Sequence, residues 1–172
     1  MADGDRRLIR PVQVERAVER RLRARRNGTT PEPSSEGRSR NMQAIRRSDT
    51  KPERVLRSAL HRAGLRFRKD LSLRLSSGRR VRPDIVFTRQ RVAVFYDSCF
   101  WHSCPQHGRV PSANEWYWAP KLARTVERDM LTNRDLKEDG WIVLRFWEHD
   151  PLQASAQRVV DQIDSRRVRS GR

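Results

Sequence analysis

The sequence predicts an α/β protein in which a few apolar strands lie between amphipathic helices. Apolar runs of strand length, rich in β-branched and aromatic residues, occur at 85–87, 91–96 and 141–147. Apolar residues recur at helical spacing in three longer segments, at 50–63, 120–139 and 152–163. The last strand is the most apolar, so we expect it to be central in the sheet. Together these segments favour one folded domain over residues 39–165.

The two ends of the chain are expected to lie outside this domain. Residues 1–38 are rich in arginine and are interrupted by Asn27-Gly28 and by a stretch rich in Pro, Ser and Gly at 31–37, which is typical of a flexible linker. A helix is possible between Val12 and Arg26. This basic, flexible arm either lies along phosphates or remains a solvated tail. A short basic tail follows at 166–172.

The charge of the chain favours a polyanionic partner. The 172 residues include 38 Lys and Arg against 21 Asp and Glu, which gives a formal net charge of +17. DNA or RNA is the expected partner, and a solubilising surface or a ribosome-associated protein is the alternative. The sequence shows neither an apolar run near the roughly 20 residues that span a bilayer nor a signal peptide at its start. We therefore expect no membrane partner and a cytoplasmic protein associated with the nucleoid.

The first helix of the domain begins with a capping-box pattern. Thr50 and Glu53 have the required spacing, Pro52 lies in the first turn, and Gly64 ends the helix. The carboxylate of Glu53 therefore has two candidate roles. It is either the acid of the capping box or a catalytic group.

The first two strands are predicted to form a hairpin across the short turn Arg89-Gln90. This pairing brings Asp84, just before the first strand, next to Tyr96 and Asp97 at the end of the second. Oxygen ligands at this position can hold a hydrated Mg²⁺, which keeps some of its waters for a substrate phosphate. Because aspartate after proline is also common in turns, a structural role for Asp84 is the alternative.

Both cysteines of the chain follow the second strand. Cys99, Cys104 and His107 form the pattern C-x4-C-x2-H, a plausible spacing for three ligands of a tetrahedral zinc. The last strand can deliver His149 to the same edge of the sheet as a fourth ligand, which makes the site closed and structural. Two alternatives stay open, namely His102 in place of His107, or two reduced thiols without a metal.

His102 is the predicted general base, because an imidazole has an ordinary pKa near neutrality. It follows Phe100-Trp101 and lies between two presumed zinc ligands, so its loop is expected to be rigid. The pair Phe100-Trp101 and the run Trp116–Trp118 can stack on bases or wedge between them. Packing into the core is the alternative for these aromatic residues.

These residues together resemble the very-short-patch-repair (Vsr-type) DNA mismatch endonucleases. The matching pieces keep their order over about residues 38–150, namely Arg40–Ile45, Arg82-Pro83-Asp84, Cys99–His102, Tyr117-Trp118, Lys121, Val126–Asp129, Gly140-Trp141 and Trp147-Glu148. The resemblance implies a variant of the restriction-endonuclease-like fold, a small mixed sheet flanked by helices with a structural zinc. It implies Mg²⁺-dependent nicking of one strand of double-stranded DNA, 5′ to the T of a T:G mismatch left by deamination of 5-methylcytosine. We expect a monomer.

By the same resemblance, Asp84 is the Mg²⁺ ligand and His102 is the general base. The residue at Tyr96 supplies a main-chain carbonyl to the metal, and Glu53 aligns with an acid near the family's site. The implied contacts with DNA are Met42, inserted from the opposite groove, and the intercalating Phe100, Trp101 and Trp118. To these we add two residues on the basic face of the 120–139 helix, Lys121 and Arg124.

The chain departs from the family pattern near both metal sites. Tyr96 replaces a threonine, and Asp97 lies where a histidine is often found, so Asp97 is a candidate second acid at the Mg²⁺. The zinc set shifts to Cys104 and His107, and His149 stands where a cysteine is expected. Two rival functions remain: a restriction-type nuclease on this scaffold that cuts both strands, and a zinc-stabilised nucleic-acid-binding protein without catalysis.

Overall fold

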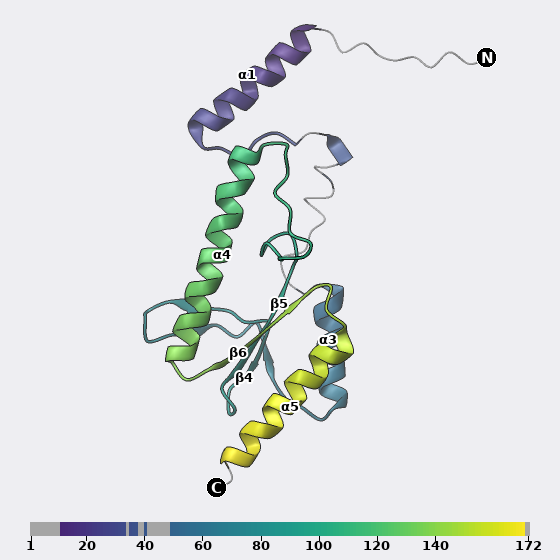
Figure 1. Ribbon diagram of the computed structural model, residues 1–172, viewed down its shortest axis with the longest axis vertical. Coiled ribbons are helices and arrows are strands. Elements are labelled where there is room, and N and C mark those ends of the chain that lie inside the picture. The colour runs from purple at the N-terminus through teal and green to yellow at the C-terminus, as the bar shows by residue number, and fades with distance from the viewer. Residues whose placement is uncertain (1–10, 34, 38–39, 41–48, 171–172) are drawn as a thin grey trace, which may run out of the picture. The chain divides into compact units, whose positions relative to one another are not determined.

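The computed structural model describes residues 11–33, 35–37, 40 and 49–170. The chain divides into two compact units, residues 1–45 with 110–121 and residues 46–109 with 122–172. The second unit carries the sheet (Figure 1). Its elements in chain order are α3 (Lys51–Arg62), β1 (Arg68–Lys69), β2 (Leu73–Arg74), β3 (Arg80–Val81), β4 (Ile85–Phe87), β5 (Val92–Asp97), the greater part of α4 (Glu115–Glu138), β6 (Ile142–Trp147) and α5 (Leu152–Ser170).

Four strands form a mixed sheet in the order β1-β4-β5-β6. The pairs β1–β4 and β4–β5 are antiparallel, whereas β5 and β6 are parallel. The predicted hairpin is confirmed, with Ile85 opposite Val94 and Val86 opposite Ala93. The predicted α/β class and small mixed sheet are confirmed as well. Strands β2 and β3 form a separate two-stranded sheet.

The strand directions bring three chain segments to one edge of this sheet. Strand β4 starts directly after Asp84 and β5 ends at Asp97, and their antiparallel pairing places these two points together. Strands β5 and β6 run parallel with Asp97 opposite Trp147, so the segments that follow both strands emerge at the same edge. This edge carries the candidate site.

Helices cover both faces of the sheet. On one face, α3 and α5 pack together over the largest apolar cluster, Leu56, Leu60, Leu65, Ile85, Phe87, Val92, Val94, Phe146, Val159 and Ile163 (Figure 1). On the other face, α4 and the β2–β3 hairpin contribute to a smaller cluster, Leu75, Val81, Ala93, Phe95 and Leu136.

The expectation that the strand at 141–147 is central was wrong. Strand β6 is the last strand of the sheet in the part of the chain that the structure describes. Phe146 packs into the cluster beneath α3 and α5, whereas Val143 packs against the cluster beneath α4. The strand is apolar because helices cover both of its faces, and not because it has a strand on either side.

A buried ionic network holds α4 against the β2–β3 hairpin. Asp135 of α4 is almost fully buried and accepts hydrogen bonds from Arg79 Nε at 3.0 Å and Ser77 Oγ at 2.8 Å. The hydrogen bonds from Arg79, Ser77 and Arg134 lower the pKa of Asp135 to about 2, so this carboxylate remains ionised at neutral pH. The network therefore anchors the C-terminal part of α4 to the hairpin.

The first unit combines α1 (Pro11–Asn27) with the start of α4. The helix predicted between Val12 and Arg26 is confirmed by α1. Thr30 Oγ1 lies 3.4 Å from the Tyr117 hydroxyl, and Lys121 Nζ donates to the same hydroxyl at 2.9 Å. These contacts tie the segment after α1 to the aromatic run that opens α4.

Helix α4 begins at Glu115, before the predicted start at Pro120. A proline within a helix removes one main-chain hydrogen bond and bends the helix without having to end it. Across the described residues, we find no helix that combines the length and the apolar character needed to cross a membrane.

Candidate active site and metal centre

Asp84 and the end of β5 lie together, as the hairpin predicts. The main-chain N–H of Tyr96 donates to Asp84 Oδ2 at 2.8 Å. Asp84 is half-buried at this edge, whereas Asp97 has only 5% of its surface exposed. The structure therefore places the carboxylate of Asp84 beside the backbone of Tyr96.

Burial raises the pKa of Asp84 to about 6. The hydrogen bond from the Tyr96 amide opposes this shift, and the negative charges of Glu53 and Asp97 reinforce it. A carboxylate that is desolvated and surrounded by like charges is in an unfavourable state when ionised. A divalent cation relieves both effects, so the surroundings of Asp84 fit a hard metal ion with oxygen ligands.

His102 lies in the loop after β5 and is held by carboxylates. Its Nδ1 lies 2.6 Å from Asp129 Oδ2 and 3.5 Å from Asp97 Oδ1. The loop is closed locally by the His102 amide, which donates to the carbonyl oxygen of Ser98 at 3.1 Å. With Nδ1 occupied in this way, Nε2 is the nitrogen that remains for proton transfer. This carboxylate–imidazole pair has the geometry of an oriented general base.

Asp129 remains ionised in this arrangement. Partial burial acts to raise its pKa, but the hydrogen bond from His102 and the charge of Arg145 outweigh it and lower the pKa below its ordinary value. An ionised Asp129 can only accept a hydrogen bond, so it favours the imidazole tautomer with the proton on Nδ1.

Neither Asp129 nor Arg145 was predicted from the sequence to have a role in the site. Asp129 lies on α4, 27 residues after its partner His102, and an acid on an amphipathic helix usually faces solvent. The only available signal was its place in the Val126–Asp129 piece of the family resemblance. Arg145 interrupts an apolar strand, and that interruption is itself a signal of a buried partner.

The carboxylate of Glu53 is held at the start of α3 by the residues just before the helix. Its Oε2 accepts a hydrogen bond from the Asp49 amide and its Oε1 accepts one from the Thr50 hydroxyl, both at 2.8 Å. Thr50 is the N-cap, but its side chain makes no capping hydrogen bond, and Glu53 accepts from the amide of Asp49 and not from that of Thr50, so the predicted capping box does not form. A catalytic role for Glu53 stays a prediction, supported by its electrostatic effect on Asp84.

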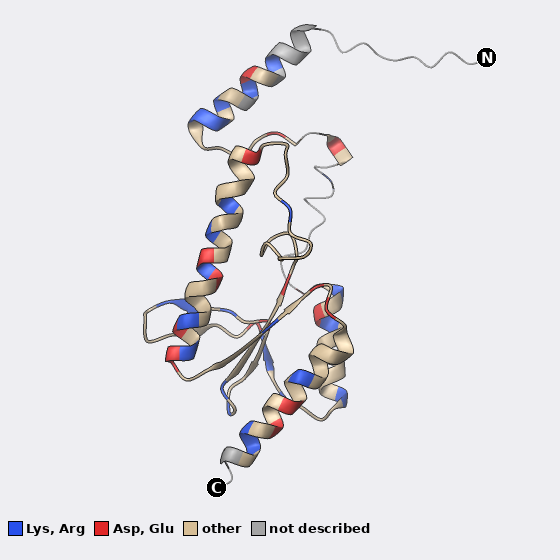
Figure 2. Cartoon of the chain, viewed as in Figure 1, with Lys and Arg blue, Asp and Glu red and all other residues tan. Residues whose placement is uncertain are grey.

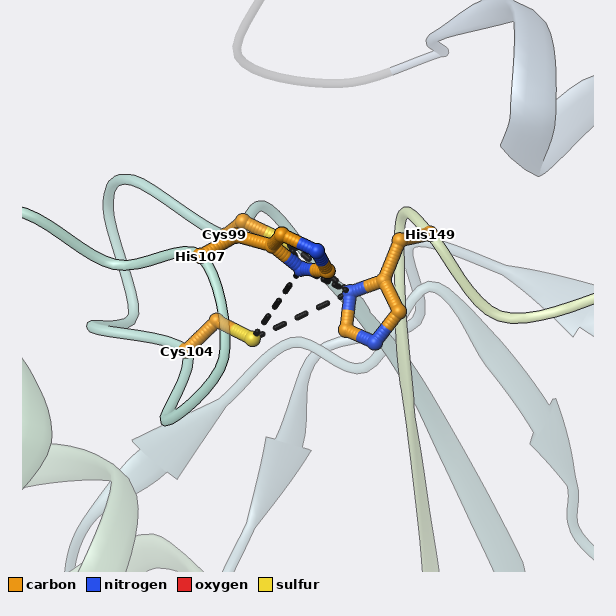
Figure 3. A group of neighbouring side chains, drawn as sticks. All are labelled: Cys99, Cys104, His107 and His149. Carbon is orange, nitrogen blue, oxygen red and sulfur yellow. Dashed lines mark hydrogen bonds between the residues drawn. The ribbon is translucent and has the colours of Figure 1, made fainter.

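The four predicted zinc ligands form one cluster (Figure 3). The ligand atoms of Cys99, Cys104, His107 and His149 all lie within 4.8 Å of one another. Cys99 Sγ lies 3.0 Å from His149 Nδ1, and the two histidine Nδ1 atoms are 3.2 Å apart. A tetrahedral zinc with bonds of 2.0–2.3 Å requires ligand separations of roughly 3.3–3.8 Å. The cluster can therefore hold a metal ion, and its two sulfur and two nitrogen donors suit zinc.

Backbone contacts shape the loop that carries Cys104 and His107. The Gly108 amide donates to the Cys104 carbonyl at 2.7 Å, and a Cβ at position 108 would lie 2.6 Å from that same oxygen. Desolvation is outweighed by the amides of His107, Gln106 and Gly108, which lower the pKa of the Cys104 thiol. Burial raises the pKa of Cys99 to about 11, so a bound dication would be needed to make it a thiolate.

The structure places the predicted DNA contacts in both units. Phe100 and Trp101 are half-buried in the second unit and meet edge to face, with ring centroids 5.0 Å apart. Trp118 belongs to the first unit, where Lys121 Nζ lies 5.3 Å from the centre of its ring. Arg124 is exposed on α4. Met42 lies outside the described residues.

Comparison with known proteins identifies a matching family and several similar proteins. The family model described as DNA mismatch endonuclease Vsr matches residues 33–106. The type II nicking enzyme V.NaeI of Lentzea aerocolonigenes is 60% identical over 143 residues, which are 83% of this chain and 86% of that protein. The type II nicking enzyme V.XorIIP of Xanthomonas oryzae pv. oryzae is 35% identical over 138 residues, 74% of this chain and 95% of that protein. DNA mismatch endonuclease Vsr of Escherichia coli is 41% identical over 113 residues, 64% of this chain and 69% of that protein.

The similarity extends over most of the chain and includes Asp84, His102 and both cysteines in the family match. The predicted resemblance is thereby confirmed, and the alternative of a binding protein without catalysis is not supported. The chain belongs to the Vsr family of DNA mismatch endonucleases and is a DNA endonuclease.

Proposed function

We propose that this enzyme nicks one strand of duplex DNA 5′ to the T of a T:G mismatch, of the kind that deamination of 5-methylcytosine leaves. The observation that carries the proposal is the His102–Asp129 hydrogen bond of 2.6 Å, which lies at the sheet edge where Asp84 is held by the Tyr96 amide. One acid that suits a hard cation and one oriented base form the minimal apparatus for hydrolysing a phosphodiester. The names of the relatives, mismatch endonuclease and nicking enzyme, support the mismatch and the single-strand cut.

In this proposal Asp84 and the main-chain carbonyl of Tyr96 hold Mg²⁺, which when bound neutralises charge on the scissile phosphate and acidifies water. His102 Nε2 accepts a proton from the water that attacks phosphorus, while Asp129 keeps Nδ1 protonated and stabilises the resulting imidazolium. The bond from phosphorus to the leaving sugar oxygen breaks, and that oxygen takes up a proton from solvent. The pKa of Asp84 near 6 leaves it ionised, and thus able to bind a cation, at neutral pH.

Asp97 was expected to be a second acid at the metal. Its Oδ2 accepts a hydrogen bond from Arg145 at 2.6 Å and its Oδ1 faces His102 at 3.5 Å. Both oxygens are thus directed toward cationic or donor groups of the protein. We therefore propose that Asp97 helps to hold His102. Its binding to Mg²⁺ stays a prediction.

The Cys/His cluster is proposed to hold a structural zinc. Four protein ligands leave no open position, so the metal would fix the loop and take no part in the reaction. Cys99 and Cys104 flank His102 in sequence, and His149 ties their loop to the end of β6. The zinc thus serves catalysis by holding the segment that presents the base.

Replacing a zinc ligand tests this role. Cys99→Ser is expected to lower bound zinc from about one per chain to near zero and to reduce the free energy of unfolding by roughly 2 kcal/mol or more. Elemental analysis and denaturant unfolding measure the two effects. His61→Gln, which changes a histidine outside the cluster, is the matched control. Unchanged zinc content in Cys99→Ser would remove the zinc assignment.

The proposed DNA surface includes aromatic wedges and basic residues. Phe100, Trp101 and Trp118, together with Met42, are proposed to insert beside the mismatch, which unstacks and kinks the duplex. Lys121 and Arg124 are proposed to contact phosphates nearby. A monomer suffices for a single nick, since one active site cuts one strand.

Helix α1 is proposed to contact phosphates along the same duplex. Arginine recurs along it (Figure 2), and Arg16, Arg20 and Arg23 share one face at positions i, i+4 and i+7. All three side chains are exposed, and Arg20 pairs with Glu32 in a solvent-exposed contact of 2.8 Å. Exposed ion pairs are weak, so this pair can exchange for a phosphate.

The salt dependence of binding tests the α1 contact. The double variant Arg16→Gln/Arg23→Gln is expected to reduce the slope of log K against log salt by up to about 2, because each phosphate contact contributes about 0.9. Fluorescence anisotropy with a labelled duplex over a range of salt concentrations measures the slope. Arg158→Gln/Arg167→Gln on α5 changes net charge equally and serves as control. Equal slopes for the two double variants would show that α1 makes no specific contribution.

The function itself is tested by nicking of a panel of duplexes. The panel contains T:G, the other mismatches and the fully paired duplex, each with and without Mg²⁺ and each labelled on either strand. We expect Mg²⁺-dependent cleavage of the T:G duplex only, and only in the strand that carries the mismatched T. Cleavage of both strands of the paired duplex would favour the restriction-type alternative, and equal nicking of all mismatches would overturn the proposed specificity.

A further inference from the structure

Arg145 makes four contacts around the catalytic pair. On β6 it lies opposite Phe95 of β5, and its guanidinium carbon is 4.4 Å from the centre of the Phe95 ring. Its Nη1 donates to Asp97 Oδ2 at 2.6 Å and its Nη2 to Asp129 Oδ1 at 3.4 Å. Its Nε donates to Asn133 Oδ1 at 2.9 Å. The guanidinium is therefore fixed in plane and in rotation by a ring beneath it and by three acceptors.

The two carboxylates are shared between Arg145 and His102. Asp129 directs Oδ1 to Arg145 and Oδ2 to His102, while Asp97 directs Oδ2 to Arg145 and Oδ1 to His102. The imidazole and the guanidinium are thus held on opposite sides of the same pair of acids. Only 7% of the Asp97 side chain and 17% of that of Asp129 are exposed, so solvent screens their mutual repulsion poorly.

We infer that Arg145 is a positioning residue for the nicking reaction, which holds Asp129 and Asp97 so that they orient His102 toward the scissile phosphate. The inference rests on the proposed function, since it assigns Arg145 to the same site. Without the guanidinium, two partly buried carboxylates converge on one imidazole nitrogen and repel each other. Asp97, freed from Arg145, can then compete with Asp129 for Nδ1.

Because Asp97 and Arg145 act as a unit, we expect their substitutions to have non-additive effects on activity. Removing the arginine alone leaves an uncompensated buried acid, whereas removing both members of the pair leaves no such charge. The double variant Arg145→Met/Asp97→Asn is therefore expected to be more active than Arg145→Met. If Arg145 acted directly on the DNA, the second substitution would not restore activity.

The experiment compares single-turnover nicking of a T:G duplex with the affinity for that duplex. Arg145→Met is expected to lower the nicking rate about tenfold to a hundredfold, less than loss of the base itself, with affinity changed less than threefold. Arg145→Lys keeps the charge without the planar fork and is expected to restore part of the rate. Arg79→Met removes the arginine partner of another buried α4 acid, Asp135, and serves as the matched control.

A second measurement does not depend on activity. The chain has four histidines, so the ring N–H signal of His102 can be assigned in ¹H–¹⁵N spectra by its loss in His102→Gln. We expect a downfield Nδ1–H signal in the parent protein and in Arg79→Met, weakened or lost in Arg145→Met and partly restored in Arg145→Met/Asp97→Asn. An unchanged signal in Arg145→Met, or additive losses of rate in the double variant, would overturn the inference. Failure of the parent protein to nick T:G with a normal His102 signal would instead overturn the proposed function alone.

Discussion

His102→Ala is expected to reduce single-turnover nicking of a T:G duplex by about 10²- to 10⁴-fold, the usual contribution of a positioned general base. The reason is that Nδ1 is occupied by Asp129 at 2.6 Å, which leaves Nε2 as the proton acceptor for the attacking water. Affinity for the duplex should stay within about threefold, because the proposed wedge and phosphate contacts are untouched. Rates with enzyme in excess and equilibrium anisotropy separate the two effects.

Asp129→Asn extends this test to the partner that orients the base. An amide of nearly the same shape can present its NH₂ group to Nδ1 and favour the wrong tautomer, and it cannot stabilise an imidazolium. We expect a loss close to that of His102→Ala, and a double variant no slower than His102→Ala alone, because the two residues act as one unit. His61→Ala is the control. Normal nicking by His102→Ala, or multiplicative losses in the double variant, would contradict the assignment.

The parts of the fold that follow from local pattern were predictable. The β4–β5 hairpin is confirmed because two apolar strands separated by a short turn have few other ways to pair. The position of β6 in the sheet was not predictable. An apolar strand is one that is covered on both faces, and this does not distinguish an edge strand from a central one. The start of α4 was also missed, since a proline such as Pro120 is compatible with a position inside a helix.

The candidate zinc cluster was predictable for a topological reason. Cys99, Cys104 and His107 are close in sequence, and parallel strands release their following segments at one edge, which supplies His149. The catalytic surroundings were harder. Asp129 comes from α4 and Arg145 from the middle of β6, so neither is near His102 in sequence, and only the packing of α4 on the sheet joins them. An arginine within an apolar strand nevertheless indicates a buried acid nearby. Asp97, at the end of the neighbouring strand, could therefore have been predicted as its partner.

Asp84→Asn is expected to abolish Mg²⁺-dependent nicking and at the same time to stabilise the protein in Mg²⁺-free buffer. The pKa of Asp84 is raised to about 6, first by burial and then by nearby acids, so its ionisation at neutral pH opposes folding. Relative to the ordinary value of 3.8, this shift corresponds to at most about 3 kcal/mol, since one pKa unit is about 1.4 kcal/mol. An asparagine keeps an acceptor for the Tyr96 amide and removes the charge. Loss of activity with a gain in stability is a combination that general damage to the fold does not produce.

The pH dependence of stability follows from the same shift. The folded-state pKa lies above the unfolded value, so the contribution of Asp84 is most favourable below about pH 4 and is lost as pH rises through about 6. The difference in unfolding free energy between Asp84→Asn and the parent protein should therefore be small at pH 4 and reach its maximum above pH 6. Denaturant unfolding of both proteins at a series of pH values, with the same zinc concentration in each sample and no Mg²⁺ added, measures this difference.

Asp70→Asn is the matched control, because Asp70 also acts electrostatically on Asp84 and its amide is directed to the Asp84 carbonyl at 3.4 Å. This control should nick normally. Adding Mg²⁺ should stabilise the parent protein and Asp70→Asn, because a ligand that binds only the folded state raises its stability, and should leave Asp84→Asn unchanged. If Asp84→Asn were less stable than the parent protein at neutral pH, or gained equally from Mg²⁺, the carboxylate of Asp84 would be a structural group. The metal would then have to bind elsewhere.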